Sequence, residues 1–316
     1  MNATTAPTHF NSYNAYLRLR FGGRVAKISL DLGIPCPHRR DHPPGCVYCR
    51  PGVIVADRIG ALGSITNQLN AGILAVGARY ETDLFLAYFQ NESASAGDLK
   101  WLLERYDEAF NHPKIVGVTI STRPDMAGDT LLDMLMARTW RKPVFLEFGL
   151  QSAHAETLAR INRGHDAEIF ADAVGRATAR RLPVTAHAIL GLPGETPEMM
   201  VETFRFLGGL PLDAVKVHHL QIYRGAALEA PWWRGEVKTF ARFEDYLPVL
   251  LDCLEVLPWR IKVQRLVADA PRTHLLAPDW GLAKNDIIAR VEAGFAARET
   301  RQGSRANPAH SIPRLF

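Results

Sequence analysis

The stretch PVTAHAILGLPGETPEMMVETFRFL, residues 183–207, decides the fold. Its apolar start predicts a buried strand over 183–195 that ends in the turn GLPGE, and a helix follows over 197–207. Similar units flank it on both sides. The predicted strands are 25–33, 83–90, 115–125, 144–152, 183–195, 214–225 and, as a possible seventh, 261–269. The predicted helices are 59–78, 97–111, 129–140, 154–161, 166–181, 197–207 and 242–257.

This alternation of strands and helices predicts an α/β protein built from parallel βαβ units. Six or seven such units suit either an open doubly wound sheet or an incomplete barrel. In both folds, functional side chains gather where the strands end. We expect an N-terminal arm over 1–20, the α/β body over 21–225, and a C-terminal extension over 226–316 that begins with a change of composition.

Composition places the chain among ordinary globular proteins: of 316 residues, 47% are hydrophobic and 22% are charged. Neither a secretory signal nor a membrane span is evident, which predicts a cytoplasmic protein without a membrane partner. The net charge of +4 is concentrated at the ends of the chain. Residues 13–50 carry seven Lys and Arg against two Asp, and 290–316 carry five Arg against two Glu. This distribution is compatible with a polyanionic partner, but scattered surface arginines are the commoner explanation.

Three of the four cysteines lie close together in CPHRRDHPPGCVYC, residues 36–49. Cys36, Cys46 and Cys49 follow the first predicted strand, and such clustering in a chain without export signals indicates metal or redox chemistry. Three soft thiolates can hold a [4Fe–4S] cluster and leave one iron open to a ligand. The fourth cysteine, Cys253, lies in an apolar run and is expected to be a buried helix residue.

Zinc is the competing interpretation of the same loop, because His38 or His42 could complete a Cys₃His site. Tyr48, an aromatic residue between the last two cysteines, favours the cluster. The cysteines alone leave both metals open.

Later segments strengthen the case for a cluster. STRPD (121–125), GLQSAHAETLARINRGHD (149–166) and HAILGLPGETPEMMVET (187–203), together with the Cys-x-aromatic-Cys pair, resemble the YhcC/YtqA-like family of radical S-adenosylmethionine (SAM) proteins. That family is related to the catalytic subunit of Elongator. The resemblance extends from about residue 11 to residue 303.

The resemblance implies a partial (β/α)₆ TIM-like barrel of the radical SAM type, followed by the C-terminal α/β extension. It implies that Cys36, Cys46 and Cys49 hold the [4Fe–4S] cluster, whose open iron binds SAM. Cleavage of SAM to a 5′-deoxyadenosyl radical would need a reductant such as flavodoxin or ferredoxin. The residues that the resemblance assigns to cofactor binding are Tyr48, Gln90 in AYFQN, Gln151, Arg163 and Gly191 in GLPGE.

Four further residues are candidates for contact with substrate or SAM. Arg123 and Asp125 in STRPD could instead form a structural ion pair. His218 belongs to an adjacent pair of strand histidines, one of which must point into the barrel. Tyr223 ends the sixth predicted strand, and ordinary packing is its alternative role.

The resemblance also implies a substrate. Some family members are tied to wobble-uridine processing, so tRNA is the expected substrate. The alternatives are a small metabolite or a protein side chain as substrate of the same chemistry and, in another class, a zinc-stabilised binding module without catalysis.

Overall fold

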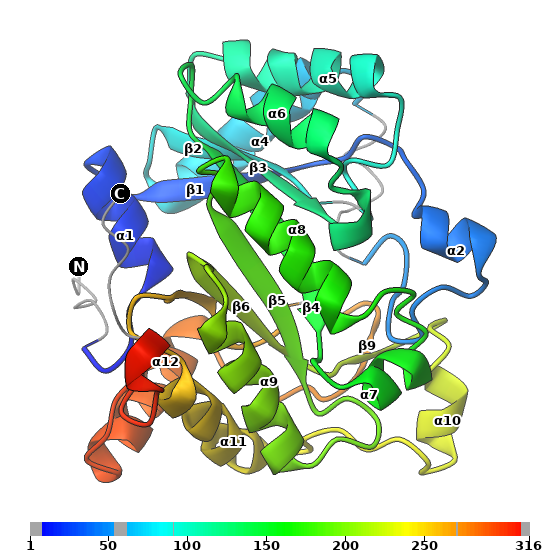
Figure 1. The fold of residues 1–316 in the computed structure, drawn as a ribbon, viewed down its shortest axis with the longest axis vertical. Coiled ribbons are helices and arrows are strands. Elements are labelled where there is room, and N and C mark those ends of the chain that lie inside the picture. Colours follow the sequence, from blue (N-terminus) through cyan, green and yellow to red (C-terminus); the bar gives the residue numbers. More distant parts are fainter. Residues whose placement is uncertain (1–7, 54–61, 91, 270, 311–316) are drawn as a thin grey trace.

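A curved sheet of seven parallel strands forms the centre of the computed structural model, which describes residues 8–53, 62–90, 92–269 and 271–310 (Figure 1). The strands follow one another in the sheet in the order β1-β2-β3-β4-β5-β6-β8. Their bounds are Val25–Leu30 (β1), Leu84–Phe89 (β2), Ile115–Thr122 (β3), Val144–Gln151 (β4), Val184–Leu190 (β5), Ala214–His219 (β6) and Lys262–Arg265 (β8). Because neighbours in the sheet are neighbours in the chain, the fold is a partial barrel, and the doubly wound alternative is excluded.

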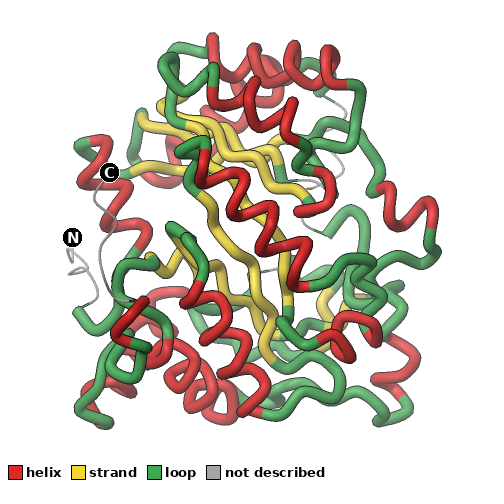
Figure 2. The backbone as a smooth tube through the Cα atoms, viewed as in Figure 1, coloured by secondary structure: helices red, strands yellow, loops and turns green. Residues whose placement is uncertain are grey.

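Helices cover the outer face of this sheet, and strands and helices alternate along the chain (Figure 2). The connecting helices are α4 (Ile65–Tyr80), α5 (Leu99–Asn111), α6 (Asp129–Met136), α7 (Ala155–Arg160), α8 (Ala167–Ala179), α9 (Pro197–Gly209), α10 (Glu229–Trp233) and α11 (Phe243–Val256). Side-chain caps fix several starts: Asp98, Asp166 and Thr196 each accept a backbone N–H from the first turn of their helix. No helix in the described ranges has both the length and the apolar character of a membrane span.

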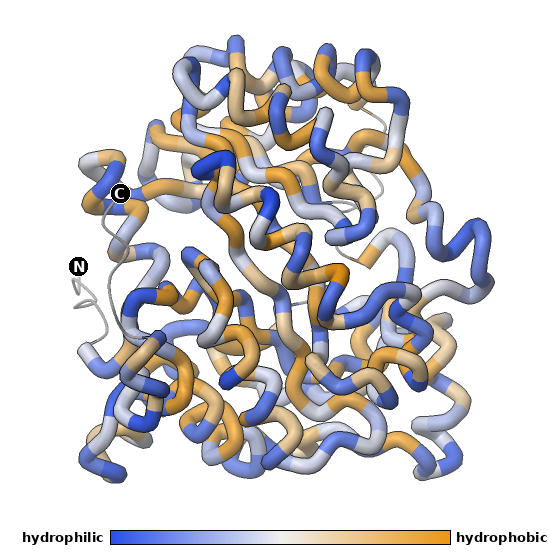
Figure 3. Tube along the Cα trace, in the orientation of Figure 1, coloured by the Kyte–Doolittle hydropathy of each residue, from blue (hydrophilic) through white to orange (hydrophobic). Residues whose placement is uncertain are grey.

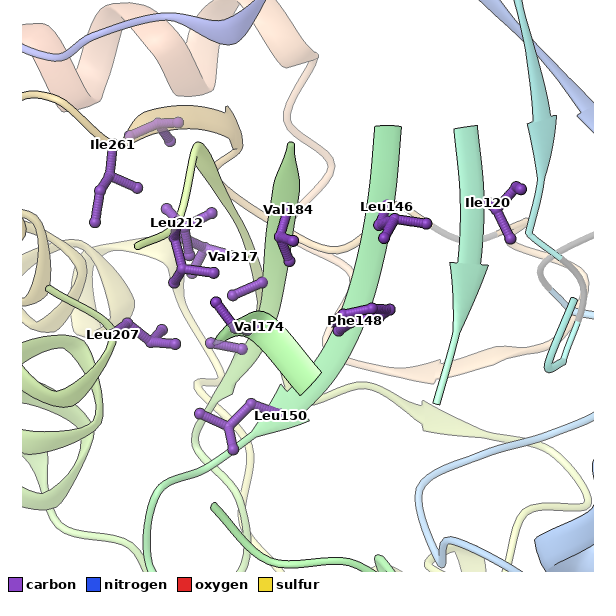
Figure 4. Close-up of a cluster of buried hydrophobic side chains, with 14 of the residues drawn as sticks. Ile120, Leu146, Phe148, Leu150, Val174, Val184, Leu207, Leu212, Val217 and Ile261 are labelled. Carbon is purple, nitrogen blue, oxygen red and sulfur yellow. The ribbon is translucent and has the colours of Figure 1, made fainter. Parts of the chain in front are cut away.

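Alternation along the strands separates the core from the inner face. On β4, Leu146, Phe148 and Leu150 are fully or almost fully buried and join the main hydrophobic core, with Val174 of α8 nearby (Figure 4). The residues between them, among them Glu147 and Gly149, therefore face the opposite side of the sheet. Strands β2 to β5 are apolar for most of their length, whereas helix α2 (Pro37–Asp41) is hydrophilic (Figure 3).

The N-terminal helix α1 (Tyr13–Phe21) lies against both edge strands, β1 and β8. Ser12 forms a parallel bridge with Val263, whose N–H donates to the carbonyl of Asn11. The side chain of Gln302, which is 1% exposed, accepts from the N–H of Asn11 and donates to two carbonyls after α11. The described segments around Asn11 and Gln302, which are far apart in the sequence, therefore meet beside the edge strands of the partial barrel.

The predicted segments correspond to the observed elements, and the differences are mostly at their ends. The strand predicted over 183–195 ends at Leu190, and the one predicted over 214–225 is divided into β6 and the short β7 (Ile222–Tyr223), which pairs with β9 (Leu275–Ala277). Residues 59–61 of a predicted helix and residues 1–7 of the predicted arm lie outside the described residues. The segment predicted as a C-terminal extension supplies β8 to the same sheet and also contains α12 (Lys284–Ala297), a helix that the sequence patterns missed.

Candidate functional site

A cavity of about 680 Å³ opens on the inner face of the sheet. Side chains from all seven strands or the residues directly beside them line it, together with the cysteine loop, α1 and the first residue of α12. Ten of the twelve predicted site residues line this cavity: Cys36, Cys46, Tyr48, Cys49, Gln90, Arg123, Gln151, Arg163, His218 and Tyr223. The topology explains this gathering, because parallel strands place their carboxyl ends at one edge.

The cysteine loop brings all three thiols to the cavity wall, and all are free. Cys36 is the N-cap of the short helix α2, and its N–H donates to the carboxylate of Glu92. The loop then folds back, so that the N–H of Cys49 donates to the carbonyl of Cys46 over 2.9 Å. The N–H of Val47 donates to the carbonyl of Ile161, which fixes the loop to the segment after β4.

Two guanidinium groups contact the thiols. Arg39 Nη2 lies 3.3 Å from Cys49 Sγ, and its Nη1 lies 2.6 Å from Glu92 Oε1. Arg163, which is 6% exposed, places Nη1 3.5 Å from Cys46 Sγ and donates through Nη2 to the Gly149 carbonyl over 2.5 Å. Burial raises the pKa of Cys49 to about 11, although the nearby Arg39 lowers it. Arg39 thus offsets part of the effect of burial on Cys49, in the direction of the thiolate, which is the form that binds metal.

These residues fit a [4Fe–4S] cluster. Three free thiols line one cavity wall, and the buried Nε of Arg163 has no hydrogen-bond partner among the described residues. His38 is engaged elsewhere: its Nε2 lies 2.6 Å from the carbonyl oxygen of Asn162. In the described part of the chain, no three His, Cys, Asp or Glu side chains are gathered around a position for a single metal ion.

Gly191 and Asp125, the other two predicted residues, are not among the described residues that line the cavity. Gly191 has a φ of +85°, and a Cβ there would lie 2.8 Å from Phe240, so both backbone conformation and packing require glycine. Asp125 forms the ion pair with Arg123 that was the structural alternative, at 2.9 Å. Arg123 itself is 4% exposed and also donates to the carbonyl of Arg163. It therefore holds the segment that carries Arg163.

Both histidines at the end of β6 line the cavity, although strand alternation predicts only one. His218 follows the inward direction of Lys216, and burial lowers its pKa well below the ordinary value. His219 is the last residue of the strand, where the regular alternation ends. Its Nδ1 accepts from the N–H of Ala268, and its ring lies 4.1 Å from that of Trp280. The Nε2 atoms of both rings are buried without a partner among the described residues.

Sequence patterns missed a buried polar network around Glu147 of β4, which is 1% exposed. Five side chains that line the cavity donate to this carboxylate over 2.6–3.1 Å: Lys27, Tyr88, His187, Lys216 and Gln264. Burial lowers the pKa of His187 to about 4, so this ring is neutral at neutral pH and donates through Nε2. A lone charge in the apolar strand VFLEFGLQS was the signal that could have revealed Glu147.

The fold, the three thiols and the motif order define a radical SAM protein. The Radical SAM superfamily model matches residues 36–207, more than half of the chain, and the Radical_SAM C-terminal domain model matches residues 212–296. The chain belongs to the YhcC/YtqA-like family of radical SAM enzymes, which use a [4Fe–4S] cluster and SAM. Protein YhcC of Escherichia coli is 34% identical to it over 85% of this chain and 87% of that protein. Family membership excludes the non-catalytic zinc module.

The chain is also similar to an archaeal tRNA-modifying enzyme and to an archaeal Elp3 structure. A tRNA uridine(34) acetyltransferase of Methanocaldococcus infernus is 27% identical over 176 residues, which are 55% of this chain and 32% of that protein. The structure of the archaeal Elp3 from the same organism shares the fold, with a TM-score of 0.68 and 19% identity. The match covers 89% of this chain and 64% of that one.

Proposed function

We propose that this enzyme modifies the wobble uridine of tRNA, with its cluster on Cys36, Cys46 and Cys49. The similarity to a tRNA uridine(34) acetyltransferase supports this substrate, because it covers over half of this chain. The cavity is also lined by many cations, which suits a polyanion. The bound cluster and SAM supply one-electron cleavage of SAM and radical removal of a hydrogen atom.

Arg163, Gln151, Gln90 and Tyr48 hold SAM in this proposal. The Arg163 guanidinium already faces the cavity beside Cys46 and keeps one nitrogen unpaired, so it can bind a carboxylate. Gln151 continues the inner-face series of Glu147 and Gly149, so it lines the cavity, and its φ of +80° lies at a register shift between β4 and β5. Tyr48 lies against the cluster loop and the apolar group that contains Ile189.

The cluster assignment is tested by anaerobic reconstitution with iron and sulfide. Replacing Cys36, Cys46 or Cys49 by Ala should remove the broad iron–sulfur absorption and the iron content. Cys253→Ala is the matched control, since this fully buried thiol lies in helix α11 and should leave the iron content unchanged. Retention of four irons by any of the three loop variants would contradict the assignment.

The substrate assignment needs a separate experiment. Reconstituted enzyme receives SAM, dithionite and total tRNA, and the nucleosides are then analysed by mass spectrometry. We expect a mass change confined to position 34 and dependent on Cys46. If the enzyme cleaves SAM but leaves every tRNA nucleoside unchanged, the tRNA proposal is wrong, and a small metabolite or protein side chain becomes the substrate to test.

A further inference from the structure

The cavity wall carries a large excess of positive charge. Ten Lys and Arg residues line it, against two acidic residues, Glu92 and Asp269. The ten are Arg18, Arg24, Lys27, Arg39, Arg50, Arg123, Arg163, Lys216, Arg265 and Lys284. Such an excess in a partly enclosed space attracts anions strongly.

Half of these cations already have partners. Lys27 and Lys216 pair with Glu147, Arg39 with Glu92, and Arg123 with Asp125. Arg163 donates to Cys46 and to the Gly149 carbonyl. These five cations serve the cluster loop and the buried network. The other five cavity-lining cations need a different role.

Three of the others come together from distant parts of the chain. Arg24 precedes β1, Arg265 ends β8, and Lys284 begins α12. None of the three forms an ion pair with any residue in the described ranges. The adjoining cavity wall partly desolvates Lys284 and lowers its pKa, the positive charges of Arg265 and Arg24 lower it further, and Asp269 raises it. Like charges held close together destabilise the protein unless an anion binds between them.

These cations are accessible at the cavity rim. Arg24 and Lys284 are exposed, and Arg265 is half-buried. Two of the C-terminal arginines are already engaged, because Arg298 and Arg305 both pair with Asp252 and Glu255. The basic C-terminal segment is therefore largely neutralised by helix α11, and the rim of the cavity is the better site for a polyanion.

We propose that Arg24, Arg265 and Lys284 bind phosphate groups of the RNA backbone beside the nucleoside that enters the cavity. This inference rests on the proposed tRNA substrate and adds the surface that holds it. Arg24 and Lys284 are exposed where they line the cavity, and an RNA strand that is too large to enter the cavity must pass over this rim. The phosphate of a small metabolite has the same chemistry, and the experiment separates these two sources.

The experiment compares reconstituted wild-type enzyme with a triple variant, Arg24→Gln, Arg265→Gln and Lys284→Gln. The matched control is Arg205→Gln, Lys238→Gln and Arg301→Gln, which removes three exposed positive charges that are not among the described cavity-lining residues. Iron content and melting temperature verify that each variant is folded and loaded. Binding of total tRNA and, separately, of uridine 5′-monophosphate is titrated at several salt concentrations.

Each lost phosphate contact removes about 0.7 from the slope of log affinity against log salt for a single strand. The rim variant should therefore lose about two units of slope and on the order of 100-fold in tRNA affinity at 0.1 M salt. The control variant should behave as wild type. Equal slopes for rim variant and wild type would overturn the proposal, as would an equal loss in the control.

Uridine 5′-monophosphate distinguishes the phosphate site from the tRNA substrate. If wild type ignores tRNA at low salt but binds the mononucleotide through the same three residues, the rim holds a small phosphorylated molecule. The RNA proposal and the proposed function then both fail, while the phosphate site itself stands. If tRNA binds through the rim but is never modified, only the proposed function fails.

Discussion

The negative charge of Glu147 holds the polar network on the inner face of the sheet together, because five side chains donate to its carboxylate. Burial raises its pKa, but Lys216, Lys27 and His187 outweigh burial and hold the pKa well below the ordinary value. A carboxyl group with a lower pKa in the folded state stabilises the fold above its unfolded pKa, about 4.3, and this contribution is lost as pH falls. The free energy of unfolding should therefore fall when the pH drops below the unfolded pKa of Glu147.

Replacing Glu147 by Gln should lower the free energy of unfolding at pH 7 by about 3–5 kcal/mol, because Lys27 and Lys216 lose their shared counter-charge. Urea titrations from pH 7 to well below pH 4 should also show a smaller loss of stability in the variant than in wild type, because the contribution of Glu147 is lost between its unfolded pKa and its lower folded pKa. Asp245→Asn removes an exposed partner of Arg242 and should change little. Parallel pH curves for wild type and Glu147→Gln would contradict the assigned role.

Gly149 gives a second test at this scale, since a Cβ there would lie 2.5 Å from Gln151 Nε2 and 2.7 Å from Arg163 Nη2. Its φ is outside the left-handed region, so Ala is strained only by these contacts. Gly149→Ala should displace both side chains and weaken SAM binding about tenfold or more, at about 1–3 kcal/mol of overpacking. Gly128→Ala, which meets nothing within 4 Å, is the control. Equilibrium dialysis with SAM measures both, and equal affinities would remove Gln151 and Arg163 from the SAM site.

At the scale of elements, the sequence predicts the strands well because an apolar run has few alternatives inside an α/β protein. Lys216 illustrates what it predicts poorly. Its position in AVKVHH indicates a strand, but only the sheet register, which aligns Lys216 with His187, places it in the network around Glu147. The contacts of Arg39, Arg163 and Arg265 likewise depend on loop paths that local patterns do not specify. The three cysteines, by contrast, lie on one loop, so their spacing alone predicts that they lie together, although the choice between a cluster and zinc needed the later motifs.

The side chain of Gln302 ties the segment before α1 to the segment between α11 and β8, so its removal should loosen α1 from the edge of the sheet. Gln302→Ala leaves the N–H of Asn11 and the carbonyls of Pro258 and Ile261 without this partner. Buried polar groups without partners cost about 1–3 kcal/mol each, so we expect about 2–4 kcal/mol less stability after partial access of water. Amide exchange in α1 should rise at the same time. Arg301→Ala, an exposed neighbour, is the control, and unchanged exchange in α1 would contradict the link.

At the scale of the molecule, the segment predicted as an extension from residue 226 shares the main core. Tyr246, Leu250 and Phe295 belong to the same cluster as Ile28 and Phe85 of β1 and β2. We therefore expect one cooperative unfolding transition for the whole chain, with near-UV and far-UV circular dichroism changing together. A fragment ending at residue 211 should fail to fold, because it lacks β6, β8 and their helices. Two separate transitions would instead support an independent C-terminal domain.

The docking of α1 on β1 and β8 also determines when this protein can finish folding on the ribosome. Helix α1 is synthesised before its partner strand β8 and before Gln302, which emerge some 240–290 residues later. At about 5–20 residues per second, α1 waits roughly 12–60 seconds without β8 and Gln302. Nascent chains therefore lack these contacts until residue 302 has emerged, so this enzyme should depend on early-binding chaperones more than its final stability suggests.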